Sequence, residues 1–209
     1  MPTRRGSGAG GEHPSMPRSD NIYELPADLP VPVDDGACAT LSGRRLPSIP
    51  LISTAGRMVD LAGRDGRTIV YCYPRTGRPD QELPKGWNEI PGARGCTPES
   101  CGFCDHYAAL RALGASVFGL STQTTEYQRE VAERLHLPFE LLSDAHLAFT
   151  TGLQLPTFNI DGMTLIKRLT LIVLNGQIEK IFYPVFPPDT HAEHVEQWLA
   201  QSARPRSAE

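Results

Sequence analysis

Long apolar runs and an excess of basic residues are both missing from this sequence of 209 residues. No stretch approaches the roughly 18 consecutive apolar residues that a membrane-spanning helix requires. Lysine and arginine number 20 against 24 aspartates and glutamates, which gives a net charge of −4 and no basic footprint for nucleic acid. We therefore expect a protein that binds neither membranes nor nucleic acid.

The N-terminal region lacks the apolar core of a secretory signal. It reads MPTRRGSGAGGEHPSMPRSD, which is rich in glycine and includes two acidic residues. Without an export signal, we expect a cytoplasmic and reducing location. Residues 1–33 are rich in Gly, Pro and Ser and predict a flexible tail and linker, followed by one domain over residues 34–209. Within the tail, NIYELPADLPVPVDDG alternates prolines with apolar residues and predicts a segment extended along the domain without regular structure.

Strand-like and helix-like segments alternate from about residue 40. The apolar runs predict strands at 45–53, 57–62, 68–73, 115–121 and 138–144, and a hairpin over the Asn175-Gly176 turn within 164–185. Helical spacing and caps predict helices at 97–114, 124–137, 145–153 and 189–202. The pattern indicates an α/β fold with a central mixed sheet flanked by helices.

A long loop separates the strand at 68–73 from the next helix. It reads TGRPDQELPKGWNEIPGARG and includes three prolines and four glycines. A loop of this length in a compact domain is uncommon and tends to be functional. Its Trp87 and Ile90 are candidates for a lid over a site or for a partner surface.

Three of the five cysteines lie within nine residues, at Cys96, Cys101 and Cys104. Cys96 directly precedes the helix that Thr97 is expected to cap and Pro98 to open. The unpaired N–H groups and the positive end of the helix dipole would therefore favour its thiolate over its thiol. Such a thiolate, if solvent can reach it, is a nucleophile. Cys38 and Cys72 are interpreted as structural.

The spacing of the cluster leaves several chemistries open. Residues five apart in an intact helix, such as Cys96 and Cys101, have Cα atoms about 8.6 Å apart, whereas a disulfide needs less than about 7 Å. A bridge between them would require the first helical turn to unwind. CGFC at 101–104 has the spacing of a dithiol–disulfide oxidoreductase. The wider C-x4-C-x2-C spacing matches the beginning of an iron–sulfur pattern, but the fourth cysteine that such a site needs does not follow Cys104. The case for a zinc site that includes His106 is weaker still.

The residues around the cluster resemble a known family. GCTPESC followed by FCDHY is similar to the G-C-T-x-x-x-C-x-F-x-D signature of the peroxiredoxins of the bacterioferritin-comigratory (Q) type. Similar segments lie on either side: TIVYCYPRTG, ALGASVFGLSTQTTEYQREVAERLHLPFELLSD and IKRLTLIVLNGQIEKIFYPV. The resemblance covers roughly residues 44–200, with the elements in the same order.

The resemblance implies a thioredoxin-like fold and an enzyme that reduces hydrogen peroxide or organic hydroperoxides. Cys96 would be the peroxidatic cysteine, which becomes a sulfenic acid, and Cys101 the resolving cysteine, which converts it to an intramolecular disulfide. Arg168 matches the arginine that holds the thiolate and polarises the peroxide. Thioredoxin or a similar dithiol would reduce the disulfide. No cofactor or metal is expected, and the protein is expected to be a monomer or homodimer.

The chain departs from the family pattern just before the nucleophile. Glu89 and Ala93 stand where the signature has Pro and Thr or Ser, and the preceding loop is about fifteen residues longer than the family norm. Pro74 and Thr76 are candidates for the displaced counterparts, unless Thr76 serves only the turn. The departure keeps other functions in view: a dithiol–disulfide oxidoreductase using Cys101 and Cys104, a cysteine-ligated metal module, or a peroxide sensor that passes its disulfide to a partner.

Overall fold

The structure, a computed structural model, describes residues 21–202. Its main sheet has seven strands in the order β2-β1-β5-β4-β3-β8-β9. The strands are β1 Leu51–Ser53, β2 Met58–Val59, β3 Arg67–Cys72, β4 Ala115–Ser121, β5 Glu140–Ser143, β8 Leu169–Leu174 and β9 Gln177–Phe182. The central β3, β4 and β5 run parallel, and the outer strands pair antiparallel. The prediction of a mixed central sheet is confirmed.

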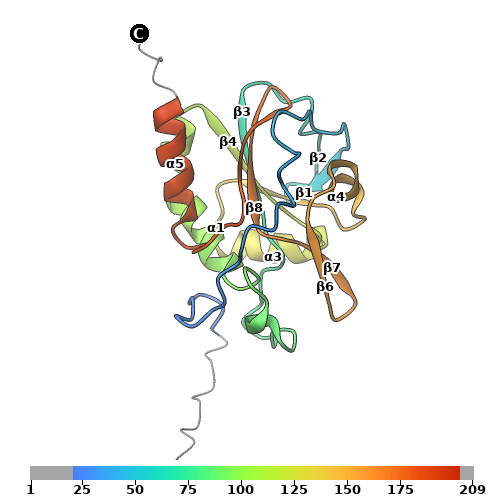
Figure 1. The fold of residues 1–209 in the computed structure, drawn as a ribbon, viewed down its shortest axis with the longest axis vertical. Coiled ribbons are helices and arrows are strands. Elements are labelled where there is room, and N and C mark those ends of the chain that lie inside the picture. The colour runs from blue at the N-terminus through green and yellow to red at the C-terminus, as the bar shows by residue number, and fades with distance from the viewer. Residues whose placement is uncertain (1–20, 203–209) are drawn as a thin grey trace, which may run out of the picture.

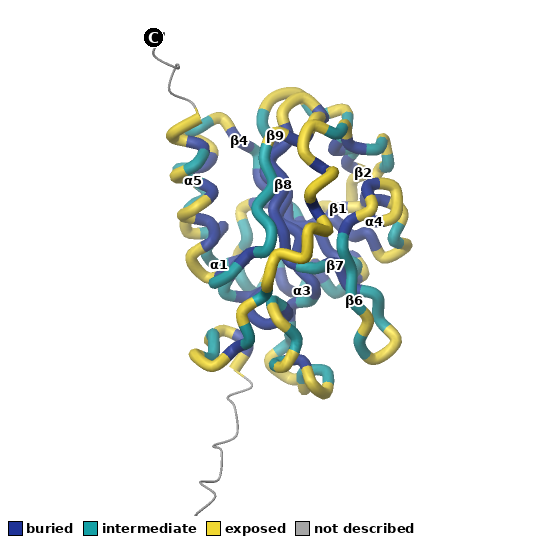
Figure 2. The backbone as a smooth tube through the Cα atoms, viewed as in Figure 1, coloured by how far each residue is buried: buried dark blue, intermediate teal, exposed yellow. Residues whose placement is uncertain are grey.

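Helices cover both faces of this sheet (Figure 1). They are α1 Cys96–Asp105, α2 Tyr107–Ala112, α3 Thr125–Arg134, α4 Ala148–Leu153 and α5 His191–Ser202. Alternate side chains of β3 serve two separate cores: Ile69 and Tyr71 pack in the core with α1, α2, α3 and α5, while Val70 and Cys72 pack in the core with α4. A strand buried on both faces reads as a continuous apolar run, as this strand does in the sequence. Figure 2 shows the resulting buried centre.

The expected single helix over 97–114 is wrong in two respects. The segment forms two helices, α1 and α2, with His106 between them. The residue that caps α1 is Gly95, in the left-handed region with φ 100°, and no side chain caps the helix. Glycine adopts this conformation at little cost. Thr97 therefore lies inside the first turn, where it is buried.

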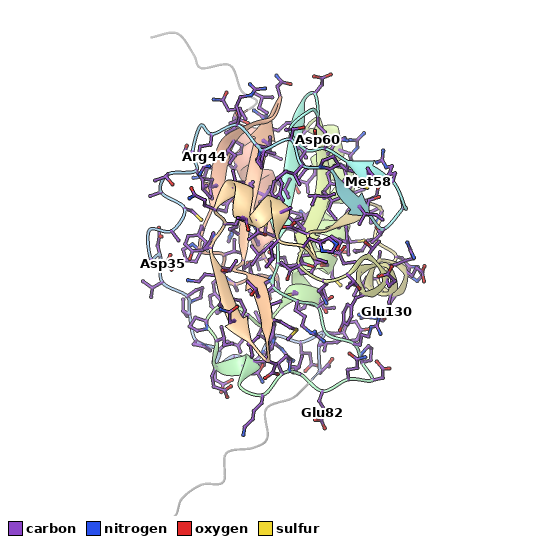
Figure 3. All side chains as sticks on the ribbon, turned by 90° about the vertical axis from the view of Figure 1, so that its right-hand side faces the viewer. Asp35, Arg44, Met58, Asp60, Glu82 and Glu130 are labelled. Carbon is purple, nitrogen blue, oxygen red and sulfur yellow. The ribbon has the colours of Figure 1, made fainter. Side chains whose placement is uncertain are left out.

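A second hairpin was not predicted. It consists of β6 Thr157–Ile160 and β7 Met163–Ile166, joined over an Asp-Gly turn at 161–162. The long loop packs against it: the 3₁₀ helix η1 Trp87–Glu89 buries Trp87 with Ala93 and Leu165 in a small third core. Figure 3 shows the hairpin extending down to this short helix. The hairpin and the loop therefore support each other.

The N-terminal segment follows the prediction in having no regular structure. The part before residue 21 lies outside the described residues, and residues 21–44 form neither helix nor strand. Two of its side chains, Ile22 and Leu29, are nevertheless buried. In Figure 1 the segment (blue) starts at the end of the molecule where the long loop lies and runs to the opposite end. The segment is thus laid along the domain from its first described residues.

Candidate active site

Cys96 and Arg168 meet although 72 positions separate them in the sequence. Cys96 begins α1, and Arg168 directly precedes β8. Arg168 Nη2 donates to Cys96 Sγ at 3.1 Å, and each residue is 3% exposed. The backbone N–H of Arg75 also donates to the Cys96 sulfur. Two of the three site residues expected from the sequence therefore share one buried contact.

Arg168 is held in place from two sides. Its guanidinium donates to the carbonyl oxygens of Gly92, Ala93 and Arg94 at 3.1 to 3.2 Å. It also forms a buried ion pair with Glu99, which lies one helical turn after Cys96. A planar guanidinium with five donors suits such a fork of acceptors. Arg168 is thereby fixed, and its Nη2 group is shared among the Ala93 and Arg94 carbonyls and the Cys96 sulfur.

Sequence reasoning missed Glu99. The residue is fully buried and belongs to the first turn of α1. The available signal was its position three residues after Cys96, since residues three apart share a helix face. An acidic residue in a first turn usually faces solvent and complements the helix dipole. Nothing in the local sequence shows that Arg168 reaches it from across the fold.

Burial opposes the charge effects at this site. Burial raises the pKa of the Glu99 carboxyl to about 7, although Arg168 lowers it. Burial likewise raises the pKa of the Cys96 thiol above its ordinary value; Arg168 lowers it and the Glu99 charge raises it. The expectation that the helix N-terminus would favour the thiolate is therefore outweighed, in this closed arrangement, by the lack of solvent around the sulfur. The Cys96 Sγ lies 3.5 Å from the carbonyl oxygen of Ala93, which accepts its hydrogen bond.

The space beside Cys96 is very small. Its volume is about 10 Å³, which is about what one water molecule requires. Its lining consists of Ile22, Arg75, Gly77, Leu83, Trp87, Arg94, Gly95, Cys96 and Thr97. Within this lining, Thr97 is the residue that carries a side-chain hydroxyl. The hydroxyl of Thr76 instead donates to Gln123 Oε1 at 3.0 Å. The displaced-threonine hypothesis therefore has no contact with Cys96 to support it.

Cys101 and Cys104 lie further along the intact helix α1. Both are partly buried free thiols, and burial together with Asp105 raises the pKa of each. The structure does not bring Cys101 to Cys96, because both belong to one regular helix. Cys38 and Cys72 are buried in the core, as expected of structural cysteines. Within residues 21–202 no three His, Cys, Asp or Glu side chains gather into a possible metal site.

The chain matches one family model and curated relatives of one kind. The Redoxin family model matches residues 41–199. Peroxiredoxin Q, chloroplastic, of Sedum lineare is 30% identical over 155 residues, which is 73% of this chain and 74% of that protein. Peroxiredoxin Bcp of Escherichia coli K12 is 29% identical over 167 residues, which is 78% of this chain and 97% of the relative.

Solved structures show the same fold. Peroxidoxin BcpB of Mycobacterium tuberculosis superposes with a TM-score of 0.63 at 23% identity, over 78% of this chain and 98% of that one. A peroxiredoxin Q of Xanthomonas campestris gives a TM-score of 0.63 at 22% identity, over 79% and 100% of the two chains. The thioredoxin-like fold is confirmed.

The chain belongs to the Redoxin family. Within that family its relatives are peroxiredoxins of the Q type, the group that the cysteine motif indicated, and the protein is accordingly an enzyme of the peroxiredoxin class. Between residues 21 and 202 no helix is long and apolar enough to cross a membrane.

Proposed function

We propose that this protein is a thiol-dependent peroxidase with Cys96 as the peroxidatic cysteine. The observation that supports the proposal most strongly is the contact of 3.1 Å between Arg168 Nη2 and Cys96 Sγ. The Cys96 thiolate bonds to one oxygen of the hydroperoxide as the O–O bond breaks. The leaving oxygen takes up a proton and departs as water or an alcohol. Cys96 remains as a sulfenic acid.

Arg168 has two roles in this step. Its positive charge favours the thiolate, since it is the largest influence that lowers the pKa of Cys96. Its Nη2 donor is also close enough to the sulfur to polarise the peroxide as charge develops on the leaving oxygen. The three backbone carbonyls and Glu99 hold the guanidinium so that no reorganisation is needed during the reaction.

Cys101 is proposed as the resolving cysteine. Its thiolate attacks the sulfur of the Cys96 sulfenic acid, forms an S–S bond and releases water. The two residues are five apart in α1, so the first turn of the helix must unwind before they can meet. A thioredoxin-like dithiol would then reduce the bridge by exchange, and the two thiols return.

The cytoplasmic location and the monomeric or dimeric state stay predictions.

The experiment that tests the proposal is intact mass and thiol counting after one equivalent of hydrogen peroxide, followed by peptide mapping. We expect a loss of two hydrogens that maps to a Cys96–Cys101 bridge. Cys96→Ser should abolish peroxide consumption, whereas Cys104→Ser should retain it. No reaction of any thiol within seconds would overturn the proposal. Fast oxidation of Cys96 without repeated turnover in the presence of a dithiol would favour the sensor instead.

A dithiol–disulfide oxidoreductase is the second candidate. Cys101 and Cys104 are three residues apart on α1, and both are partly exposed, unlike Cys96. Peptide mapping separates the two functions directly. A Cys101–Cys104 bridge formed without oxidation of Cys96, and dithiol exchange that survives Cys96→Ser, would favour this candidate.

A further inference from the structure

Part of the lining of the small space beside Cys96 comes from the N-terminal segment and from the lengthened loop. Ile22 precedes the residues matched by the Redoxin model, which begin at 41. Leu83 and Trp87 belong to the lengthened loop. In Figure 1 the first described residues (blue) and this loop (green) both lie at the lower end of the molecule, below α1. We call residues 21–25 the N-terminal strap.

Ile22 is the strap residue that closes the space. It is 7% exposed, whereas its neighbours on the strap, Asn21, Tyr23 and Glu24, are exposed. It lies against the backbone of Gly77: a Cβ placed on Gly77 would be 2.7 Å from Ile22 Cγ2 and 3.4 Å from Leu83 Cδ2. Glu82, next to Leu83, is exposed and points away from the molecule (Figure 3). Ile22 and Leu83 therefore both lie against Gly77 and line the space beside Cys96.

Polar contacts with two arginines hold the strap in place. Arg94 Nη2 donates to the carbonyl oxygen of Asn21 at 2.6 Å. Arg134 donates from Nη1 to Tyr23 Oη at 2.8 Å and from Nη2 to the Gly77 carbonyl at 3.1 Å. Arg134 thus fastens the strap and the loop together. The contact of Arg134 with Tyr23 is exposed to solvent, whereas Arg94 is buried. Elements held by few buried contacts open more readily than the core.

The space beside Cys96 is narrow, and Cys96 itself is 3% exposed. A volume of about 10 Å³ suffices for one water-sized molecule, whereas hydrogen peroxide has two oxygens and an organic hydroperoxide is larger again. Ile22 is also absent from the three apolar cores that hold the domain together. Its packing beside the Cys96 space is therefore local, and truncating its side chain leaves those cores intact.

We propose that Ile22 is a substrate gate: the strap must release it before a hydroperoxide reaches Cys96, and its presence selects small hydroperoxides over bulky ones. This inference rests on the proposed peroxidase function and names the residue that sets access to that site. It assigns Ile22 a specificity role and leaves the chemistry to Cys96 and Arg168.

Two variants open the gate by different routes. Ile22→Ala removes the side chain that fills the entrance. Gly77→Ala places a methyl group 2.7 Å from Ile22 Cγ2, so the isoleucine side chain must shift; Gly77 has no left-handed backbone, so alanine is accepted there. Val31→Ala is the matched control, because it truncates a β-branched apolar side chain in the same N-terminal segment that is 61% exposed and is not among the residues that line the space beside Cys96.

The measurement is the alkylation rate of Cys96 in the reduced full-length protein, resolved by peptide mass spectrometry, with iodoacetamide and with a bulky maleimide dye. We expect both opening variants to raise the rate about tenfold, given what burial of an isoleucine contributes. The ratio of the bulky to the small reagent should rise as well. A change in the pKa of Cys96 alone would scale both reagents alike, so this ratio reports access. Unchanged ratios in both opening variants would overturn the gate.

Peroxide kinetics separate the gate from the proposed function. In single-turnover oxidation, Ile22→Ala should raise the rate with cumene hydroperoxide more than the rate with hydrogen peroxide, while Val31→Ala leaves both unchanged. Equal preference in wild type and Ile22→Ala would overturn the gate while the peroxidase stands. A raised alkylation ratio without any oxidation of Cys96 by peroxide would support gated access to the thiol and overturn the peroxidase.

Discussion

One guanidinium serves both a thiol and a carboxylate at the centre of this molecule. Cys96, Arg168 and Glu99 are all buried, and Arg168 contacts both of the others. The motif around Cys96 and the resemblance at Arg168 were enough to name the first two residues from the sequence. Glu99 was not found, because its burial depends on a residue that arrives from β8 and not on its own neighbours.

The first prediction concerns Glu99. Because its negative charge raises the pKa of Cys96, Glu99→Gln should lower that pKa. The neutral amide still accepts a hydrogen bond from Arg168, whose charge then acts on Cys96 alone. We expect the midpoint of Cys96 alkylation against pH to move to lower pH. Glu126→Gln, at an exposed position on α3, is the control. An unchanged or higher midpoint in Glu99→Gln would contradict the charge assignment.

Two hairpins show what can be read from sequence at the scale of elements. The β8–β9 hairpin was predicted from its Asn175-Gly176 turn between two buried apolar runs. The β6–β7 hairpin has the equally clear signal Asp161-Gly162, but its strands are short and only half-buried, so they lack a regular alternation. That hairpin is held by the third core, which the long loop completes. Local patterns do not reveal a contact of this kind.

The turns of these hairpins give a matched pair of variants. Gly162 and Gly176 both have left-handed backbones, with φ 74° and 76°. Nothing lies within 4 Å of a Cβ placed on Gly162, whereas one on Gly176 would be 2.2 Å from the carbonyl oxygen of Ala62. Gly162→Ala should therefore cost about 1 kcal/mol, from the backbone conformation alone.

Gly176→Ala should cost at least about 3 kcal/mol, because a backbone carbonyl must also move. Urea unfolding of the two variants and the wild type measures both losses in free energy of unfolding. If Gly162→Ala were as destabilising as Gly176→Ala, the contact with Ala62 would not be the cause.

At the scale of the whole molecule, the sequence predicted the sheet and its helices better than the position of residues 21–44. The central mixed sheet, the succession of strands and helices along the chain and the closing helix follow from apolar runs and turn signals. The course of residues 21–44 does not, because a segment rich in proline has no period that says which face it lies on. Its position emerges from single side chains such as Ile22 and Leu29, which are buried by the folded domain. The boundary between tail and domain at residues 33 and 34 stays a prediction.

His191 joins α5 to α1 and to the sheet, and gives a test of their cohesion. It lies at the start of α5, where its Nε2 pairs with Thr170 Oγ1 of β8 at 2.8 Å. Its ring meets Phe103 of α1 and Phe182 of β9 edge to face. Burial lowers the pKa of His191 from the ordinary 6.5 to about 3. The folded protein therefore keeps this imidazole neutral in mild acid, where the unfolded chain binds a proton.

The sign of the pH effect follows from that difference. Between about pH 6.5 and 3 the unfolded state holds one more proton at this site, so stability present above pH 6.5 is lost as the pH falls. The loss from this residue approaches about 1.4 kcal/mol per pH unit. In His191→Gln, whose amide can still pair with Thr170, urea unfolding at pH 7, 6, 5 and 4 should show a shallower loss of stability than the wild type. His136→Gln, at an exposed position, controls for removing one imidazole. Parallel curves for His191→Gln and wild type would mean that acid weakens the fold through other groups, and that the contact of α5 with β8 is not what mild acid breaks.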